Sequence, residues 1–249
     1  YKNAKSRSPR GEIGRHKGLK ILAACGVPVR VWPRAPKNML INFLRRKIIN
    51  FVCKGWSSRK QWNLFHEVFS RKKKFKEIAI LGVYHGKDLA YMCSALKKNN
   101  HKNFKIYAVD LFEDLAGADW GEENKHLKWK DLNAGPPPSL EKSKFIINLL
   151  GFSKYVQFIK GDFKKLMEFK PQLDFVYIDL SHDYETTCDA INLCVKLSHK
   201  NTIIMGDDFY DGEIFGVPWG VKQAVKDKFR NYKLHYNYFW ESDINNLKN

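Results

Sequence analysis

Hydrophobic and polar positions follow two patterns along this chain, and together they predict short strands alternating with amphipathic helices. Short apolar runs rich in β-branched and aromatic residues are too brief for helices and predict buried strands. These strands are predicted at residues 77–81, 106–109, 156–159, 174–178, 202–205 and 232–240. Apolar residues at helical spacing predict amphipathic helices. The helices are predicted at residues 39–52, 59–70, 87–97, 140–150, 184–197 and 221–229.

This alternation predicts an α/β fold with a doubly wound, Rossmann-like and mostly parallel sheet that carries helices on both faces. Crossovers between parallel strands should be right-handed, and the last strand is expected to run antiparallel. The 249 residues allow one such domain, which we expect at residues 75–249 after N-terminal helices at residues 39–74. Residues 111–138 form an unusually long insert, which indicates either a lid closed by Trp120 or Trp129 or a loop folded over the sheet edge.

Acidic residues follow two neighbouring strands of the predicted sheet. Asp179 comes directly after the strand at 174–178, whereas Asp207 and Asp208 follow the strand at 202–205. Ligands bind at the carboxyl ends of parallel strands, where these side chains should meet His182. Asp is also common in ordinary turns, but three acids and a histidine at one edge favour an active site over that alternative.

A second group of residues lies at the same edge and is typical of a nucleotide site. Gly82 and Gly86 flank a strand-to-helix turn that contains Tyr84. Glycine tolerates positive φ there and lets the backbone approach a ligand closely. Asp110 ends the next strand, where it can accept hydrogen bonds from a ribose. Asp162 follows the third strand and is expected either to receive an adenine amino group or to cap a turn.

The net charge of +18 invites a nucleic-acid interpretation, but its distribution is uneven. Residues 1–37 contain ten Lys or Arg and one acid, Glu12, and therefore carry half of that charge. Residues 11–36 also resemble a tRNA gene translated as if it were protein. We expect residues 1–38 to be a non-native extension of the reading frame, with the natural start at Met39. The alternative is a basic, disordered arm that binds nucleic acid.

Other features of the composition indicate a cytoplasmic protein. Five cysteines show no C-x-x-C spacing, so we expect reduced thiols and neither a zinc site nor a disulfide framework. Because no run of 18 apolar residues exists, no transmembrane helix is expected. The predicted helix at 39–52 is amphipathic and basic. It could lie on a membrane surface, cover the sheet edge or form a dimer contact, and the oligomeric state stays open.

Four motifs resemble those of a known family. The chain shows ILGVYHG after the first strand of the domain, VDLF after the second, YIDLSHDYE after the fourth and GDDF after the fifth. In these motifs it resembles the class I S-adenosylmethionine-dependent methyltransferases, over residues 75–240. The pattern is most similar to the small-molecule O-methyltransferase group that includes macrocin-type and cephalosporin hydroxylase-like proteins. Ile80, where the family often has an acid, and Leu180, where it usually has glycine, depart from that pattern.

The resemblance implies a role for each of these residues. The cofactor S-adenosylmethionine would be held by Gly82, Tyr84, Gly86, Asp110 and Asp162. A divalent metal, expected to be Mg²⁺, would be held by Asp179, Asp207 and Asp208, with Asp179 and His182 as the catalytic residues and His182 as the base. The implied reaction is O-methylation of a hydroxylated small molecule, of which a sugar is one example. Two alternatives stay open: an RNA methyltransferase, and a non-catalytic binding protein that keeps the fold.

Overall fold

The computed structural model describes residues 20–22, 28–30, 37–53, 55–71, 74–115, 126–131, 135–214 and 217–248. The chain divides into two compact units, Tyr1–Phe43 and Leu44–Asn249. In the first unit, β1 (Lys20–Leu22) and β2 (Pro28–Arg30) pair antiparallel, which the sequence pattern did not predict. The helix α1 (Lys37–Val52) continues into the second unit.

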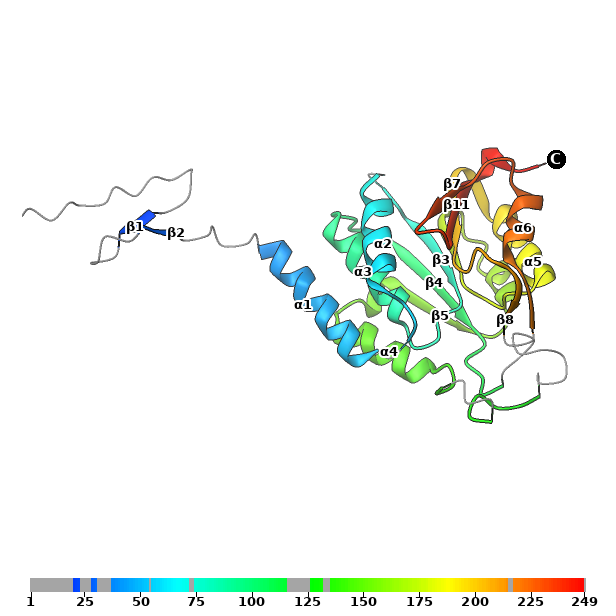
Figure 1. Cartoon of the computed structure of the whole chain (residues 1–249), viewed down its shortest axis with the longest axis horizontal. Coiled ribbons are helices and arrows are strands. Elements are labelled where there is room, and N and C mark those ends of the chain that lie inside the picture. The colour runs from blue at the N-terminus through cyan, green and yellow to red at the C-terminus, as the bar shows by residue number, and fades with distance from the viewer. Residues whose placement is uncertain are drawn as a thin grey trace, which may run out of the picture. The chain divides into compact units, whose positions relative to one another are not determined.

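The second unit is built on a seven-stranded sheet with the order β10-β11-β7-β6-β3-β4-β5. Its strands are β3 (Glu77–Leu81), β4 (Lys105–Asp110), β5 (Val156–Lys160), β6 (Leu173–Ile178), β7 (Ser198–Gly206), β10 (Lys233–His235) and β11 (Phe239–Asp243). The strands from β7 to β5 pair in parallel, whereas β11 pairs antiparallel with β7 and β10 antiparallel with β11. Figure 1 shows this sheet between its helices, so the mostly parallel, doubly wound fold is confirmed.

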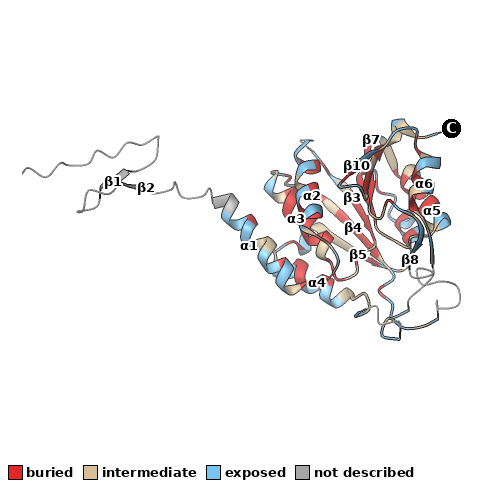
Figure 2. Ribbon diagram, viewed as in Figure 1, coloured by how far each residue is buried: buried red, intermediate tan, exposed pale blue. Residues whose placement is uncertain are grey.

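Successive residues of each central strand face opposite sides of the sheet and enter two separate hydrophobic cores. On β3, Ile78 and Ile80 pack in the core formed with α2 (Arg59–Arg71), α3 (Lys87–Lys98) and α4 (Leu140–Leu149). Its neighbours Ala79 and Leu81 pack in the core formed with α5 (Tyr184–Lys196), α6 (Val221–Lys228) and the short helix η3 (Phe163–Glu168). Figure 2 shows the buried residues along the strands, and helices therefore cover both faces as expected.

The structure differs from the sequence prediction at two hairpins. The single strand predicted at 232–240 is wrong, because β10 and β11 form a hairpin whose turn holds Tyr236 at φ 55° and Asn237 at φ 71°. A second hairpin joins β8 (Asp211–Ile214) to β9 (Val217–Gly220), where no strand was predicted. This second hairpin begins three residues after Asp208, in the segment that follows β7.

Two expectations from composition can be compared with the described residues. Four of the five cysteines are described, and all four are free and buried: Cys53, Cys93, Cys188 and Cys194. Within the described ranges, none of the helices is both long and apolar enough to cross a membrane. Trp120 of the predicted lid lies outside the described residues, whereas Trp129 is inside them.

Candidate functional site

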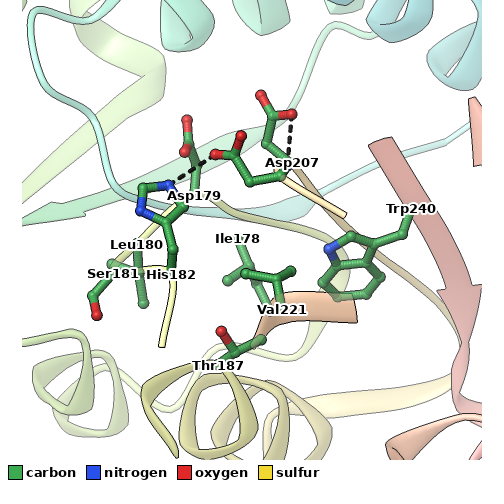
Figure 3. A pocket seen from close by; sticks show the side chains of 10 residues that line it. Ile178, Asp179, Leu180, Ser181, His182, Thr187, Asp207, Val221 and Trp240 are labelled. Carbon is green, nitrogen blue, oxygen red and sulfur yellow. Dashed lines mark hydrogen bonds and ion pairs between the residues drawn. The ribbon is translucent and has the colours of Figure 1, made fainter. Parts of the chain in front are cut away.

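The predicted acids and the histidine gather at the carboxyl ends of β6 and β7. These strands are paired in parallel, with Ile178 opposite Gly206, so Asp179 and Asp207 leave the sheet side by side. Figure 3 shows the side chains of Asp179, His182 and Asp207 gathered at this edge. A small cavity lies beneath them. Its lining is Ile178, Asp179, Leu180, Ser181, His182, Thr187, Asp207, Asp208, Val221 and Trp240.

Three of these residues form a compact group of donor atoms. One carboxylate oxygen each of Asp179 and Asp208 and one ring nitrogen of His182 lie within 4.8 Å of one another. His182 Nε2 is hydrogen-bonded to Asp208 Oδ2 at 2.8 Å. The imidazole also stacks on Trp219 of β9, with ring centroids 3.9 Å apart and planes 5° from parallel. We call Asp179, His182 and Asp208 the strand-end cluster.

Asp207 lies beside this cluster, but its carboxylate accepts hydrogen bonds from a different set of residues. Its Oδ2 accepts hydrogen bonds from Gln61 Nε2 at 3.0 Å and from the Tyr177 hydroxyl at 3.3 Å. Its Oδ1 accepts from the backbone N–H of Asp208 at 2.8 Å. Asp208 itself has φ 55°, a left-handed conformation that a non-glycine residue seldom adopts. This turn sends two consecutive carboxylates to different partners.

Burial and the charge of neighbouring acids make the carboxyls of Asp179 and Asp207 hard to ionise. Burial, with Asp207 and then Asp208 as the next contributors, raises the pKa of Asp179 well above its usual range. Burial followed by the charge of Asp208 raises the pKa of Asp207 to about 8. Perturbed carboxyls in a cleft are typical of functional sites. A bound cation at this edge would relieve the repulsion among them.

The glycines of the 82–86 loop are explained by contacts with protein. Gly82 has φ +88°, and a Cβ built there would lie 1.6 Å from the carbonyl oxygen of Asp179. Gly86 has φ +79°, and its Cβ would lie 3.0 Å from the Cα of Ser143 on α4. Only glycine therefore fits at position 82. The close approach at this position joins the glycine loop to the strand end that carries Asp179.

Asp110 at the end of β4 organises the same loop. Its Oδ2 accepts hydrogen bonds from the backbone N–H groups of Val83 at 2.7 Å and Tyr84 at 2.8 Å. Its Oδ1 accepts from Phe112 N–H at 2.7 Å. A carboxylate offers about four lone-pair positions, so Asp110 keeps the capacity to accept from a further hydroxyl. Asp162 is exposed, and its Oδ1 accepts a hydrogen bond from Lys164 N–H at 2.8 Å. This bond caps a turn, which was one of the two roles expected for Asp162.

Aromatic rings from two other segments pack beside Tyr84. Tyr84 stacks on Trp56, with ring centroids 6.0 Å apart, and lies 5.6 Å from the ring of Trp129 in the insert. Its hydroxyl donates to the carbonyl of Pro136 at 2.7 Å. The described part of the insert therefore packs on the glycine loop. His85 is buried, and its Nε2 is hydrogen-bonded to the carbonyl oxygen of Pro137 at 2.9 Å.

Sequence reasoning missed a buried polar network beneath the strand-end cluster. Gln61 of α2 is buried, and its Nε2 also lies 3.3 Å from Asp88 Oδ2 and 3.3 Å from the Tyr177 hydroxyl. Asp88 accepts a further bond from the Ser57 hydroxyl at 2.8 Å, and burial raises its pKa to about 6. The available signal was Gln61 itself, a polar residue on the apolar face of a helix. Trp219 carried no such signal, because its hairpin was not predicted.

Comparison with known proteins agrees with this geometry. A family model described as a methyltransferase domain matches residues 80–209, which is more than half of the chain. That interval contains the glycine loop, Asp110, Asp162 and every member of the strand-end cluster. No curated protein matches the sequence.

Solved structures match the chain in fold at low sequence identity. The O-methyltransferase NovP matches with a TM-score of 0.57 at 15% identity, over 74% of this chain and 79% of its own. An O-methyltransferase from Bacillus cereus in complex with SAH matches with a TM-score of 0.52 at 12% identity, over 85% and 92%. The Podospora anserina methyltransferase PaMTH1, bound to SAH, matches with a TM-score of 0.53 at 11% identity, over 83% and 87%. The chain therefore belongs to the methyltransferase domain family and has the fold of the class I methyltransferases.

Proposed function

We propose that the chain transfers a methyl group from S-adenosylmethionine to a hydroxyl of a small molecule, with a divalent cation at the strand-end cluster. The observation that carries this proposal is the convergence of Asp179, His182 and Asp208 donor atoms within 4.8 Å, at the sheet edge where class I enzymes bind ligands. The structural neighbours with SAH in their descriptions support S-adenosylmethionine as the methyl donor.

The donor set of the strand-end cluster fits a divalent cation. Carboxylate oxygens and water suit Mg²⁺ and Mn²⁺, so Asp179 and Asp208 offer the type of ligand that these ions prefer. We propose Asp179 and Asp208 as ligands in this arrangement. Asp207 would join them only by giving up its bonds to Gln61 and Tyr177, so we place it as the weakest of the three proposed ligands. A cation held here would lower the pKa of an acceptor hydroxyl.

We propose that His182 takes the proton of that hydroxyl. A histidine accepts a proton near neutral pH, and a neighbouring carboxylate stabilises the resulting imidazolium. Asp208 Oδ2, 2.8 Å from His182 Nε2, supplies this carboxylate, and the stacked ring of Trp219 fixes the plane of the imidazole. Methyl transfer is an in-line displacement at a sulfonium, so most of the remaining work is positioning of donor and acceptor.

The glycine loop and Asp110 are proposed to hold the cofactor. Asp110 fixes the loop through Val83 and Tyr84 and keeps lone pairs for ribose hydroxyls. Gly82 and Gly86 shape the loop, and Tyr84 presents its ring beside Trp56 and Trp129. Asp162 is proposed to reach the adenine amino group while it caps η3.

One alternative acceptor has support from composition. The basic charge of the chain favours RNA as the acceptor. The two acceptors differ in salt dependence, because RNA binding falls steeply as salt rises. Binding of RNA that weakens by several orders of magnitude between low and physiological salt would favour the RNA acceptor.

The proposed function is tested by formation of S-adenosylhomocysteine in the presence of a panel of hydroxylated small molecules. We expect turnover with at least one sugar or phenol, loss of turnover with chelator, and recovery on addition of Mg²⁺ or Mn²⁺. His182→Gln should lower turnover at least roughly a hundredfold, because it removes the base. Turnover that is indifferent to chelator would contradict the cation, and failure to bind S-adenosylmethionine would contradict the whole proposal.

A further inference from the structure

One side of helix α1 is fixed to the domain. Ile49 is fully buried and Cys53, four residues later, is also buried in the core that contains α2 and α3. The side chain of Asn50 accepts a hydrogen bond from the Tyr91 hydroxyl, and the guanidinium of Arg45 lies 5.1 Å from the ring centroid of Phe152. This part of α1 therefore presents a defined outward face.

That outward face is apolar. Leu44, Ile48 and Phe51 recur at helical spacing and are exposed, and 90% of the surface of Phe51 is accessible. Figure 2 shows the exposed residues of α1. A contiguous row of exposed large apolar side chains on a soluble domain marks an interaction surface. We call Leu44, Ile48 and Phe51 the α1 face.

The segment of sequence that contains the α1 face carries charge of one sign. Residues 44–66 contain six basic residues and no acidic one. The basic residues are Arg45, Arg46, Lys47, Lys54, Arg59 and Lys60. This count does not depend on the basic residues 1–37. An apolar face in an acid-free, basic segment fits a partner that offers both hydrocarbon and negative charge.

We propose that the α1 face docks on a membrane surface that contains anionic lipid. Helices of this kind lie in the interface, with aromatic and aliphatic side chains among the acyl chains and Lys or Arg beside the headgroups. A second copy of the chain would bring two identical basic segments together, and like charges at short range oppose that contact. RNA would leave Leu44, Ile48 and Phe51 without apolar contacts.

The test is co-sedimentation of the full chain with vesicles of phosphatidylcholine, with and without phosphatidylserine. We expect binding that requires phosphatidylserine. Combined Leu44→Gln, Ile48→Gln and Phe51→Gln substitutions should weaken it at least roughly tenfold, although every basic residue is kept. The matched control replaces two exposed apolar residues outside α1, Met167→Gln and Leu234→Gln, and should bind like the unchanged chain.

Three results would overturn the proposal. The first is an unchanged chain that binds no vesicles, or binds phosphatidylcholine alone equally well. The second is a triple variant that binds as tightly as the unchanged chain. The third is an unchanged chain that does not bind vesicles but forms a dimer in sedimentation velocity, while the triple variant is a monomer. The affinity of the triple variant for S-adenosylhomocysteine, measured in the absence of vesicles, verifies that the variant is folded. A variant that loses this affinity is replaced by the single substitution Phe51→Gln, which should still weaken vesicle binding.

Discussion

Gln61 donates a hydrogen bond from Nε2 to Asp207 Oδ2 across 3.0 Å and so ties helix α2 to the carboxyl end of β7. The bond explains why two consecutive acids have different surroundings. Asp207 faces Gln61 and the Tyr177 hydroxyl, whereas Asp208 faces His182. Asp207, which adjoins the strand-end cluster, is thus held by a helix that lies more than one hundred residues earlier in the chain.

We predict that Gln61→Leu lowers the free energy of unfolding by about 1–3 kcal/mol, because it removes one donor from the buried carboxylates of Asp207 and Asp88. The matched control is Gln223→Leu, since Gln223 donates to Asp227 at 2.9 Å on an exposed surface. The control should change stability by less than about 0.5 kcal/mol. Denaturant titration measures the free energy of unfolding of both variants. Equal losses would mean that the buried hydrogen bond stabilises the fold no more than the exposed one.

The close approach of Gly82 to Asp179 gives a second prediction. Gly82→Ala places a Cβ 1.6 Å from a carbonyl oxygen, so we expect a loss of more than about 3 kcal/mol or no folded protein. Gly151→Ala is the control, because Gly151 also has positive φ but a Cβ there meets nothing within 4 Å. It should lose only about 1 kcal/mol from backbone strain. Thermal unfolding compares the two, and a mild effect at Gly82 would contradict the packing.

The raised pKa of Asp207 predicts how stability depends on pH without added metal. Burial and Asp208 raise that pKa from an ordinary 3.8 to about 8, so the folded chain favours the protonated carboxyl. The folded state then binds more protons than the unfolded state, and the free energy of unfolding should fall as pH rises from about 4 to about 8. Asp207→Asn should reduce this fall and, in chelator at pH 8, gain at least about 1 kcal/mol. Identical pH slopes for the two proteins would show that Asp207 does not titrate in this way.

Asp110 is predicted to matter for the cofactor more than Asp162. Asp110→Asn replaces one acceptor oxygen by a donor beside the N–H groups of Val83, Tyr84 or Phe112. We expect the affinity for S-adenosylmethionine, measured by calorimetry, to fall at least roughly tenfold. Asp162→Asn tests the adenine contact separately, and a change below about threefold would remove Asp162 from the proposed site. Unchanged affinity in Asp110→Asn would remove the ribose contact instead.

The central sheet could be predicted because its strands are short apolar runs separated by helical patterns, as at 77–81 and 174–178. The two hairpins could not be predicted from such patterns. The turn of the β10–β11 hairpin places Tyr236 and Asn237 at positive φ without glycine at either position. Asn237 alone is a weaker turn signal than Asn followed by glycine, so the run is predicted as one strand. Tertiary pairing with β7, not local sequence, determines where that strand ends.

The strand-end acids could be placed at one edge from sequence, because parallel strands expose their carboxyl ends together. Their partners could not be assigned in this way. Asp207 and Asp208 are adjacent and chemically identical, and only the left-handed backbone at Asp208 separates them. The hydrogen bond between Asp207 and Gln61 and the stacking of His182 on Trp219 join distant segments, which no local pattern encodes.

The central claim is that the strand-end cluster binds a divalent cation, and calorimetric titration of the chain with Mn²⁺ or Mg²⁺ tests it most directly. We predict one ion per chain, with binding lost in Asp179→Asn and in Asp208→Asn. The control Asp189→Asn alters an exposed acid that pairs with Lys164 at 3.4 Å and should bind the ion normally. Absence of binding by the unchanged chain, or undiminished binding by Asp208→Asn, would contradict the account.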